Sequence, residues 1–157
     1  LAIILEPVRR NTAPAIAIAA IKAVEHYKEK KIDPILLILS SDHYIEDVDE
    51  FQKSIKKSID AAKKGGLVIF GIIPSHPATG YGYIKAENEL KNNHYLPEKV
   101  EKFIEKPDLK TARLLFEDKK YSWNSGMFVC KASSILQELS KFTPDIVENC
   151  QQCLKKK

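Results

Sequence analysis

The sequence predicts an α/β fold built on a doubly wound, mostly parallel sheet. Three apolar runs suited to buried strands, at residues 1–5, 35–39 and 67–73, alternate with two amphipathic helical segments. A continuous apolar run suits a strand covered on both faces, as in a parallel sheet. Strands that alternate with helices form βαβ units with right-handed crossovers. At 157 residues the chain is long enough for one domain with a sizeable core.

The first helix is expected over residues 13–30, after a polar loop at residues 6–12. Asn11 or Thr12 can cap its start, and Pro14 is tolerated in its first turn. Apolar residues recur on one face at helical spacing, namely Ile16, Ala20, Ala23, Val24 and Tyr27.

The second helix is expected to begin at Asp47 or Asp49 and to end at Gly65 and Gly66. Glycine adopts the left-handed conformation that commonly closes a helix, so the pair marks a stop. The apolar stripe of this helix is Phe51, Ile55, Ile59 and Ala62.

The regular alternation of strand and helix stops near residue 80. Residues 83–89 and 99–105 are predicted as two strands around a polar loop, and Asp108 is predicted to cap a helix. The apolar face of that helix is Leu109, Ala112, Leu115 and Phe116. The remaining predicted elements are a strand at 127–131 and helices near 134–141 and 144–154.

The composition is that of an ordinary globular protein, and its charge is compatible with an anionic small-molecule ligand without implying one. A net charge of +4, spread over 25 basic and 21 acidic residues, is too small and diffuse to indicate nucleic acid. No apolar run approaches the roughly 20 residues of a membrane helix, and no signal peptide is visible. Three cysteines do not make a disulfide framework, so we expect a cytoplasmic protein.

Three segments together supply the glycine, aromatic, polar and charged residues that suit a sugar phosphate. They are Thr79-Gly80-Tyr81-Gly82-Tyr83-Ile84, Glu105-Lys106-Pro107 and Trp123-Asn124-Ser125-Gly126-Met127-Phe128. Glycine lets the backbone approach a ligand, aromatic faces stack, and Asn, Glu and Lys bind hydroxyls or phosphate. Taken singly, the second segment also fits an exposed ion pair before a strand-ending proline. The third also fits a turn anchored by a buried Trp.

Two loops that follow predicted strands carry further candidates. Asp42, between Ser41 and His43, lies at the carboxyl end of the second strand, where ligands bind in open α/β sheets. An aspartate there can hold Mg²⁺ together with substrate phosphates, or it can cap a turn. The segment at residues 6–12 precedes a helix, whose free N–H groups favour an anion beside its arginines. Asn11 can equally serve as a helix cap.

Other residues of reactive types have no expected chemistry. Cys150 and Cys153 form a lone C-x-x-C pair without the further ligands of a zinc site or the βαβ context of a redox motif. His26, His76 and His94 stand alone, so no Ser-His-Asp or H-E-x-x-H arrangement can be built.

These motifs occur together in the order and spacing of one family. They are Glu6-Pro7 with Arg10-Asn11-Thr12-Ala13-Pro14-Ala15, Ser41-Asp42-His43, Phe70-Gly71-Ile72, Thr79 to Ile84, Phe103-Ile104-Glu105-Lys106-Pro107 and Trp123 to Phe128. With them the chain resembles the bacterial-type mannose-1-phosphate guanylyltransferases, or GDP-mannose pyrophosphorylases, from Leu5 to about Ile146.

The resemblance implies a fold, a reaction and a set of site residues. The fold would be Rossmann-like, a mostly parallel mixed sheet flanked by helices. Mannose 1-phosphate would attack the α-phosphorus of GTP with Mg²⁺ present, giving GDP-mannose and pyrophosphate. Asp42 and Lys106 would be catalytic, with Asp42 as metal ligand. Glu6, Arg10 and Asn11 would surround the nucleotide, and Gly82, Glu105, Lys106 and Asn124 would contact mannose 1-phosphate or GDP-mannose.

The chain departs from the family pattern in places. Arg9 stands where the family usually has Gly, and Ser40-Ser41 replace the usual Pro-Ala. The chain begins with Leu1 inside an expected strand, with no Gly-rich triphosphate loop before it and no identifiable second metal-binding Asp. We therefore expect residues 1–157 to be the central part of one catalytic domain, without its N-terminal loop and C-terminal remainder, and inactive or weakly active alone.

Alternative functions remain open at this point. A sugar nucleotidyltransferase using UTP or dTTP would share the fold and a similar Glu-Lys-Pro segment. A non-catalytic sugar-nucleotide-binding subunit would keep the glycine-rich surface, and a purely structural domain would bind none of these ligands. The sequence does not decide whether a phosphomannose isomerase domain is fused to the intact protein, and a homo-oligomer is compatible with it.

Overall fold

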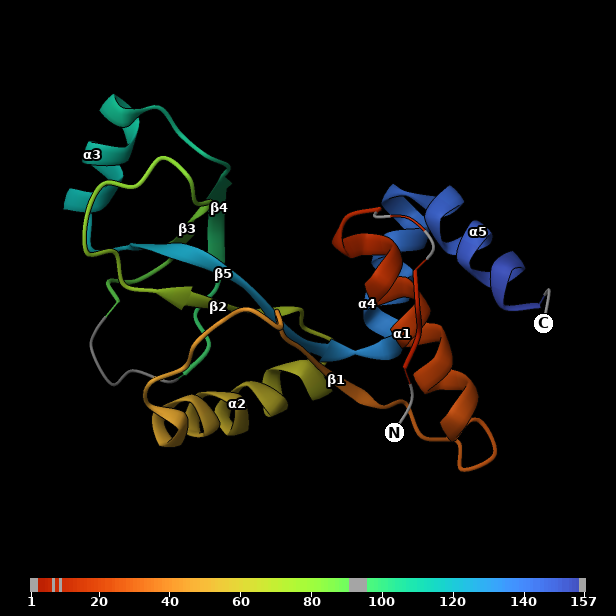
Figure 1. Cartoon of the computed structure of the whole chain (residues 1–157). Coiled ribbons are helices and arrows are strands. Elements are labelled where there is room, and N and C mark those ends of the chain that lie inside the picture. Colours follow the sequence, from red (N-terminus) through yellow and green to blue (C-terminus); the bar gives the residue numbers. More distant parts are fainter. Residues whose placement is uncertain (1–2, 7, 9, 91–95, 156–157) are drawn as a thin grey trace.

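The computed structural model describes residues 3–6, 8, 10–90 and 96–155 (Figure 1). Its helices and strands follow in the order α1 (Thr12–Tyr27), β1 (Ile35–Ile38), α2 (Val48–Lys63), β2 (Val68–Ile72), β3 (Tyr83–Ala86), β4 (Val100–Ile104), α3 (Leu109–Glu117), β5 (Tyr121–Lys131), α4 (Ala132–Phe142) and α5 (Pro144–Lys155). Every helix predicted from the sequence is present, with its ends shifted by a few residues. Among the described residues no helix is long and apolar enough to cross a bilayer.

The prediction of a strand at residues 1–5 is wrong for the residues of this range that the structure describes. Residues 3–6 form neither helix nor strand, and residues 1 and 2 lie outside the described residues. Ile3 is 81% and Leu5 86% exposed. No described strand pairs with this segment, and an apolar run without a partner strand has no ladder to join.

The sheet is antiparallel where the sequence predicted mostly parallel pairing. β5 pairs antiparallel with β1, β2 and β3, and β3 pairs antiparallel with β4. Val129 and Phe128 pair with β1 and also with β2, so these two strands lie on opposite edges of β5. β1 and β2 therefore run in the same direction, as the βαβ pattern requires, but β5 separates them. The α/β class, with helices flanking a sheet, is confirmed.

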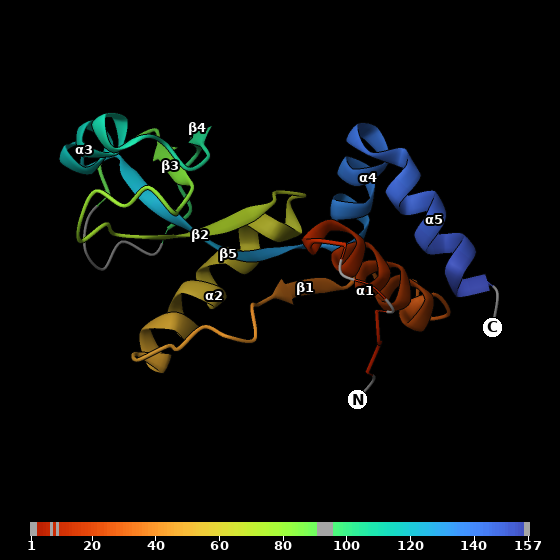
Figure 2. The ribbon, with the colours of Figure 1, turned by 45° about the horizontal axis from the view of Figure 1, so that its top comes forward.

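The helices cluster around the two ends and one face of the sheet. α1, α4 and α5 pack on one another at the end of β5 that continues into α4, and α2 packs on β1, β2 and β5 (Figure 2). α3 lies at the opposite end of β5, beside β3 and β4 (Figures 1 and 2). One buried cluster belongs to each end. The cluster near α3 consists of Ala78, Tyr83, Ala112, Leu115 and Trp123. The cluster between α1 and α5 consists of Ala17, Ile21 and Cys150.

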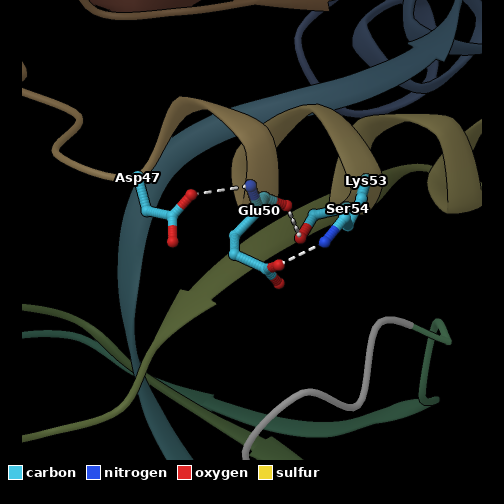
Figure 3. A network of polar contacts seen from close by, with 4 residues as sticks. All are labelled: Asp47, Glu50, Lys53 and Ser54. Atoms are coloured by element: carbon cyan, nitrogen blue, oxygen red, sulfur yellow. Dashed lines mark hydrogen bonds and ion pairs between the residues drawn. The ribbon is translucent and has the colours of Figure 1, made fainter.

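The ends of α2 follow from local sequence. The side chain of Asp47 accepts a hydrogen bond from Glu50 N at 2.9 Å, so Asp47 rather than Asp49 is the cap (Figure 3). Lys53 pairs with Glu50 one turn later. At the other end, Gly65 has φ 93° and donates to Ala62 O, while Gly66 donates to Ala61 O. This is the Schellman closure that the two glycines predict.

The start of α4 is capped from a distant part of the chain. Its own N-cap residue, Lys131, makes no capping hydrogen bond. Asp33, from the loop before β1, instead accepts from Ser133 N at 3.1 Å and from Ser133 Oγ at 2.6 Å. A residue 100 positions away in sequence thus supplies the capping carboxylate and fixes α4 against β1.

Candidate active site

Gly82 lies against two other predicted site residues, Glu105 and Asn124. A Cβ at this position would lie 2.8 Å from Oε2 of Glu105 and 2.8 Å from Cζ of Phe103, so a larger residue requires these neighbours to move. Gly82 O accepts a hydrogen bond from Asn124 N at 2.7 Å. The structure therefore brings together Gly82 before β3, Glu105 after β4 and Asn124 within β5.

Asn124 lies in a bulge of β5 rather than in a turn before a strand. β2 advances two residues, from Ile69 to Gly71, while β5 advances four, from Phe128 to Asn124. Ser125 Oγ donates to Phe70 O at 2.8 Å and holds the bulge against β2. The strand predicted at residues 127–131 is thus the second half of an 11-residue strand. Bulges of this kind re-aim side chains, and they are common beside active sites.

The Asn124 side chain is oriented by its own backbone. Oδ1 accepts a hydrogen bond from Gly126 N at 3.1 Å, and Gly126 adopts φ 72°. That positive φ is where glycine carries no steric penalty. Among the described contacts the Nδ2 group of Asn124 makes no hydrogen bond, so this side chain retains an unused donor.

Glu105 and Lys106 form an exposed pair with an unusual backbone. Lys106 Nζ lies 3.7 Å from Oε1 of Glu105, and both side chains are more than half exposed. Such a surface pair contributes little to stability. Lys106 also has φ 41°, which is costly for a residue with a side chain. Buried Pro107 and the α3 cap at Asp108 hold this conformation in place from the C-terminal side.

The α3 cap is a charge-assisted interaction. Asp108 Oδ1 accepts from Thr111 N at 2.7 Å, and this hydrogen bond lowers the pKa of the Asp108 carboxyl. The sequence prediction of Asp108 as a cap is confirmed. Because Asp108 follows Lys106 and Pro107 directly, the cap also fixes the end of the predicted phosphate-binding segment.

A cross-strand ion pair lies on the strands next to this site. Lys85 Nζ on β3 approaches Glu101 Oε2 on β4 at 2.9 Å. The hydrogen bond to Glu101 raises the pKa of Lys85, and the same bond lowers the pKa of Glu101. The pair reinforces the β3–β4 ladder without using the candidate site residues.

Asp42 lies in the exposed loop between β1 and α2, after the end of β1 as predicted. In the part of the chain that the structure describes, no group of three or more His, Cys, Asp and Glu side chains could hold a metal ion. A lone exposed carboxylate is a hard oxygen ligand and fits Mg²⁺ that takes its other ligands from phosphates and water. It does not fit an all-protein metal cage.

The predicted nucleotide-side residues lie apart from the Gly82 cluster. Glu6, Arg10 and Asn11 are exposed, and Arg9 lies outside the described residues. The N-terminal segment and the start of α1 sit with α4 and α5, at the end of the molecule away from α3, β3 and β4 (Figures 1 and 2). The structure therefore does not bring these residues together with Gly82, Glu105 and Asn124.

Asn11 occupies the N-cap position of α1 without capping it. Its φ of 63° and ψ of −169° lie in a region that is essentially reserved for glycine, and its side chain makes no capping hydrogen bond. Of the two caps that the sequence offered, Asn11 holds the N-cap position without a side-chain hydrogen bond, and Thr12 is the first residue of α1. In α5, burial first, and then the charges of Cys153 and Glu6, raise the pKa of the Cys150 thiol.

Sequence reasoning missed the role of Phe103. This residue is 47% exposed, and its ring occupies the space that a Cβ at Gly82 would need, two residues before Glu105. The signal was available, because residues two apart in a strand face the same side. Trp123 was predicted as part of a sugar-phosphate segment or as a turn anchor, and it belongs to the buried cluster near α3.

Comparison with known proteins agrees with the motifs. The family model described as "Nucleotidyl transferase" matches residues 1–157. Mannose-1-phosphate guanylyltransferase of Klebsiella pneumoniae is 47% identical over 149 residues, which is 95% of this chain and 31% of that protein. The chain thus spans about a third of the length of the curated relatives it matches.

Two solved structures have the same fold. A mannose-6-phosphate isomerase of Helicobacter pylori superposes with a TM-score of 0.76 and 38% identity, covering 94% of this chain and 52% of that one. A mannose-1-phosphate geranyltransferase of Thermus thermophilus gives a TM-score of 0.79 and 27% identity, covering 97% and 42%. Their names give different activities, so the structural likeness supports the fold and not one reaction.

Proposed function

The chain belongs to the nucleotidyl transferase family, and we propose that the protein containing it makes GDP-mannose and pyrophosphate from GTP and mannose 1-phosphate. The observation that carries the proposal is the contact of Gly82 with both Glu105 and Asn124. A backbone surface, a carboxylate and an amide at one place suit the hydroxyls of a hexose. The name shared by relatives such as the Klebsiella pneumoniae protein supports mannose as the sugar.

The proposed reaction is a displacement at phosphorus. A phosphate oxygen of mannose 1-phosphate forms a bond to the α-phosphorus of GTP. The bond from that phosphorus to the bridging oxygen breaks, and pyrophosphate leaves with the electron pair. No covalent enzyme intermediate is needed, so the protein contributes positioning and charge neutralisation.

Each candidate residue has a role in this scheme. Lys106 places a positive charge at the sugar phosphate, and Glu105 accepts hydrogen bonds from sugar hydroxyls. The Gly82 backbone and the Asn124 amide fix the sugar between them. Mg²⁺, when bound, neutralises phosphate charge, and Asp42 is the residue that would hold it.

The nucleotide side of the site is proposed to involve Glu6, Arg10 and Asn11. Free N–H groups at the start of α1, which directly follows Asn11, favour an anion. These residues share no described contact with the Gly82 cluster, so GTP would have to extend between the two regions. We further propose that residues 1–157 are the central part of one catalytic domain with little activity alone. Substantial pyrophosphate release by this chain alone would contradict that proposal.

The test is pyrophosphate release by the full-length protein with mannose 1-phosphate and Mg²⁺. We expect release with GTP and little with UTP or dTTP. Preference for UTP or dTTP would assign a different sugar nucleotidyltransferase. Binding of GDP-mannose without turnover, and with little dependence on Mg²⁺, would identify a non-catalytic subunit instead.

The three free cysteines, Cys130, Cys150 and Cys153, are compatible with a reducing compartment. We propose a cytoplasmic location on this ground. Fractionation of cells that express the full-length protein would test it.

A further inference from the structure

Trp123 lies where the loop carrying Gly82 meets the rest of the molecule. Its side chain is 8% exposed and belongs to the buried cluster with Tyr83 on β3 and Leu115 on α3. Its backbone pairs with Ile72 of β2 on one edge and with Tyr83 of β3 on the other. The loop at residues 73–82 connects these two strands, so both of its ends are fixed to Trp123.

The same loop also packs on the indole ring. The His76 ring lies 4.9 Å from the Trp123 ring, edge to face at 69°, and the Tyr81 ring lies 5.0 Å away at 49°. Both separations fall in the range of favourable aromatic pairs. Tyr83 adds a third tie, because its hydroxyl donates to Ala78 O at 2.8 Å. The middle of the loop is therefore held as well as its ends.

These contacts bear directly on the candidate site. Tyr81 immediately precedes Gly82, and Asn124 immediately follows Trp123. Asn124 N donates to Gly82 O, and Gly82 lies against Glu105. A movement of the Tyr81 ring over Trp123 would therefore change the spacing between Gly82 and Glu105.

The indole ring, and not its N–H group, makes these contacts. Trp123 Nε1 is buried and has no hydrogen-bond partner among the described residues. Removing an unpartnered donor breaks no hydrogen bond. A phenylalanine at this position keeps an aromatic face and loses only the unused N–H and part of the ring.

We propose that Trp123 is a positioning residue for the mannose 1-phosphate site. Its ring holds the loop at residues 73–82 so that the Gly82 backbone stays against Glu105 and Asn124. The residue acts through the loop and does not touch the reacting atoms. This inference rests on the proposed function, since the sugar phosphate is the ligand whose binding it affects.

The test compares variants of the full-length protein in the GTP and mannose 1-phosphate reaction. Trp123→Leu removes both ring contacts and should raise KM for mannose 1-phosphate about tenfold, with KM for GTP within about twofold of wild type. Trp123→Phe should recover most of this loss. Leu115→Ala is the matched control, because it removes a side chain of the same buried cluster from α3 rather than from beneath the loop. It should lower Tm and leave KM for mannose 1-phosphate unchanged.

Contrary results separate the possible failures. If the wild type is active and Trp123→Leu and Leu115→Ala raise KM for mannose 1-phosphate equally, the cause is a general loss of stability. That result would overturn the positioning role. A Phe variant no better than the Leu variant would overturn the role of the ring. A wild type that makes no GDP-mannose would overturn the proposed function and this inference with it.

A double-mutant comparison gives an independent check on the Tyr81 contact. If Trp123 acts through Tyr81, the double variant Tyr81→Leu/Trp123→Leu should have a KM for mannose 1-phosphate little above that of Tyr81→Leu alone. The effects of mutations at residues in contact are generally not additive. If the two fold-changes multiply instead, the residues act separately and the proposal fails.

Discussion

The two ends of the molecule hold their candidate residues in different ways. At the end with α3, Gly82, Glu105 and Asn124 are linked by close packing and a hydrogen bond, above a buried aromatic cluster. At the end with α1, Arg10 and Asn11 are exposed, and the Asn11 side chain makes no capping hydrogen bond. The proposed sugar-phosphate side is thus held by packing and hydrogen bonding within this chain, whereas the described residues of the proposed nucleotide side at α1 show no such contacts with one another.

The comparison teaches that motif strength and local organisation are separate properties. Both regions match the family pattern, but packed β-strands hold only one of them. A ligand pays less to bind a site whose groups are already in place. We therefore expect substitutions at the α3 end to act through geometry, and those at the α1 end to act through strain and charge.

The largest effect is expected for Gly82→Ala. The new Cβ would lie 2.8 Å from both Glu105 Oε2 and Phe103 Cζ, and these groups would have to move. A displacement near 1 Å at a site can cost about a hundredfold in rate, or about 2.7 kcal/mol. Gly80→Ala is the control, because its Cβ meets nothing within 4 Å. Equal kcat/KM for the two variants would show that the packing at Gly82 is not needed.

Asp42→Asn should have the next largest effect. The change removes a hard anionic oxygen from the proposed Mg²⁺ site in an exposed loop, where the fold does not depend on it. Turnover at limiting Mg²⁺ should fall at least about tenfold, or about 1.4 kcal/mol. Asp49→Asn, an exposed aspartate in the first turn of α2, should leave turnover unchanged. Normal turnover of the Asp42 variant at limiting Mg²⁺ would rule out the metal role.

Asn11→Gly tests the strain at the α1 end. Glycine adopts φ 63° with ψ −169° freely, so the variant should raise the free energy of unfolding by about 1 kcal/mol. If the Asn11 side chain contacts nucleotide, the same variant should raise KM for GTP. Urea unfolding and GTP titration give the two measurements. A variant that is less stable than wild type would argue against backbone strain at this position.

The smallest effect concerns the α3 cap and pH. The pKa of Asp108 is lowered by its hydrogen bond to Thr111, so the folded state favours the carboxylate. Its contribution to stability is full above the unfolded pKa of about 4 and is lost as pH falls through the lower folded pKa. Asp108→Asn keeps a capping side chain without this titration. Urea unfolding should be measured between pH 5 and pH 2, which covers the ordinary aspartate range. The free energy of unfolding should fall slightly less steeply with falling pH in the variant than in the wild type. An identical fall in both proteins would show that the Asp108 cap does not contribute to it.

Much of the local structure was predictable from short stretches of sequence. Asp47, one of the two caps predicted for α2, and Asp108 cap their helices, and Gly65 with Gly66 closes α2. These features depend on residues within one or two turns, so the sequence alone contains their cause. The Gly82 motif was also recognised, whereas the packing of Phe103 against it depends on the pairing of β3 with β4.

The remaining features depend on which segments meet in space. The sequence by itself determined the number and type of most elements, the caps of α2 and α3, and the residues that identify the family. Tertiary structure decided that β5 lies between β1 and β2, that its bulge aims Asn124, and that Asp33 caps α4 across 100 residues. Strand order and register depend on hydrogen bonds between distant segments, and the side-chain pattern of a single strand does not say which strand it will pair with or in which direction.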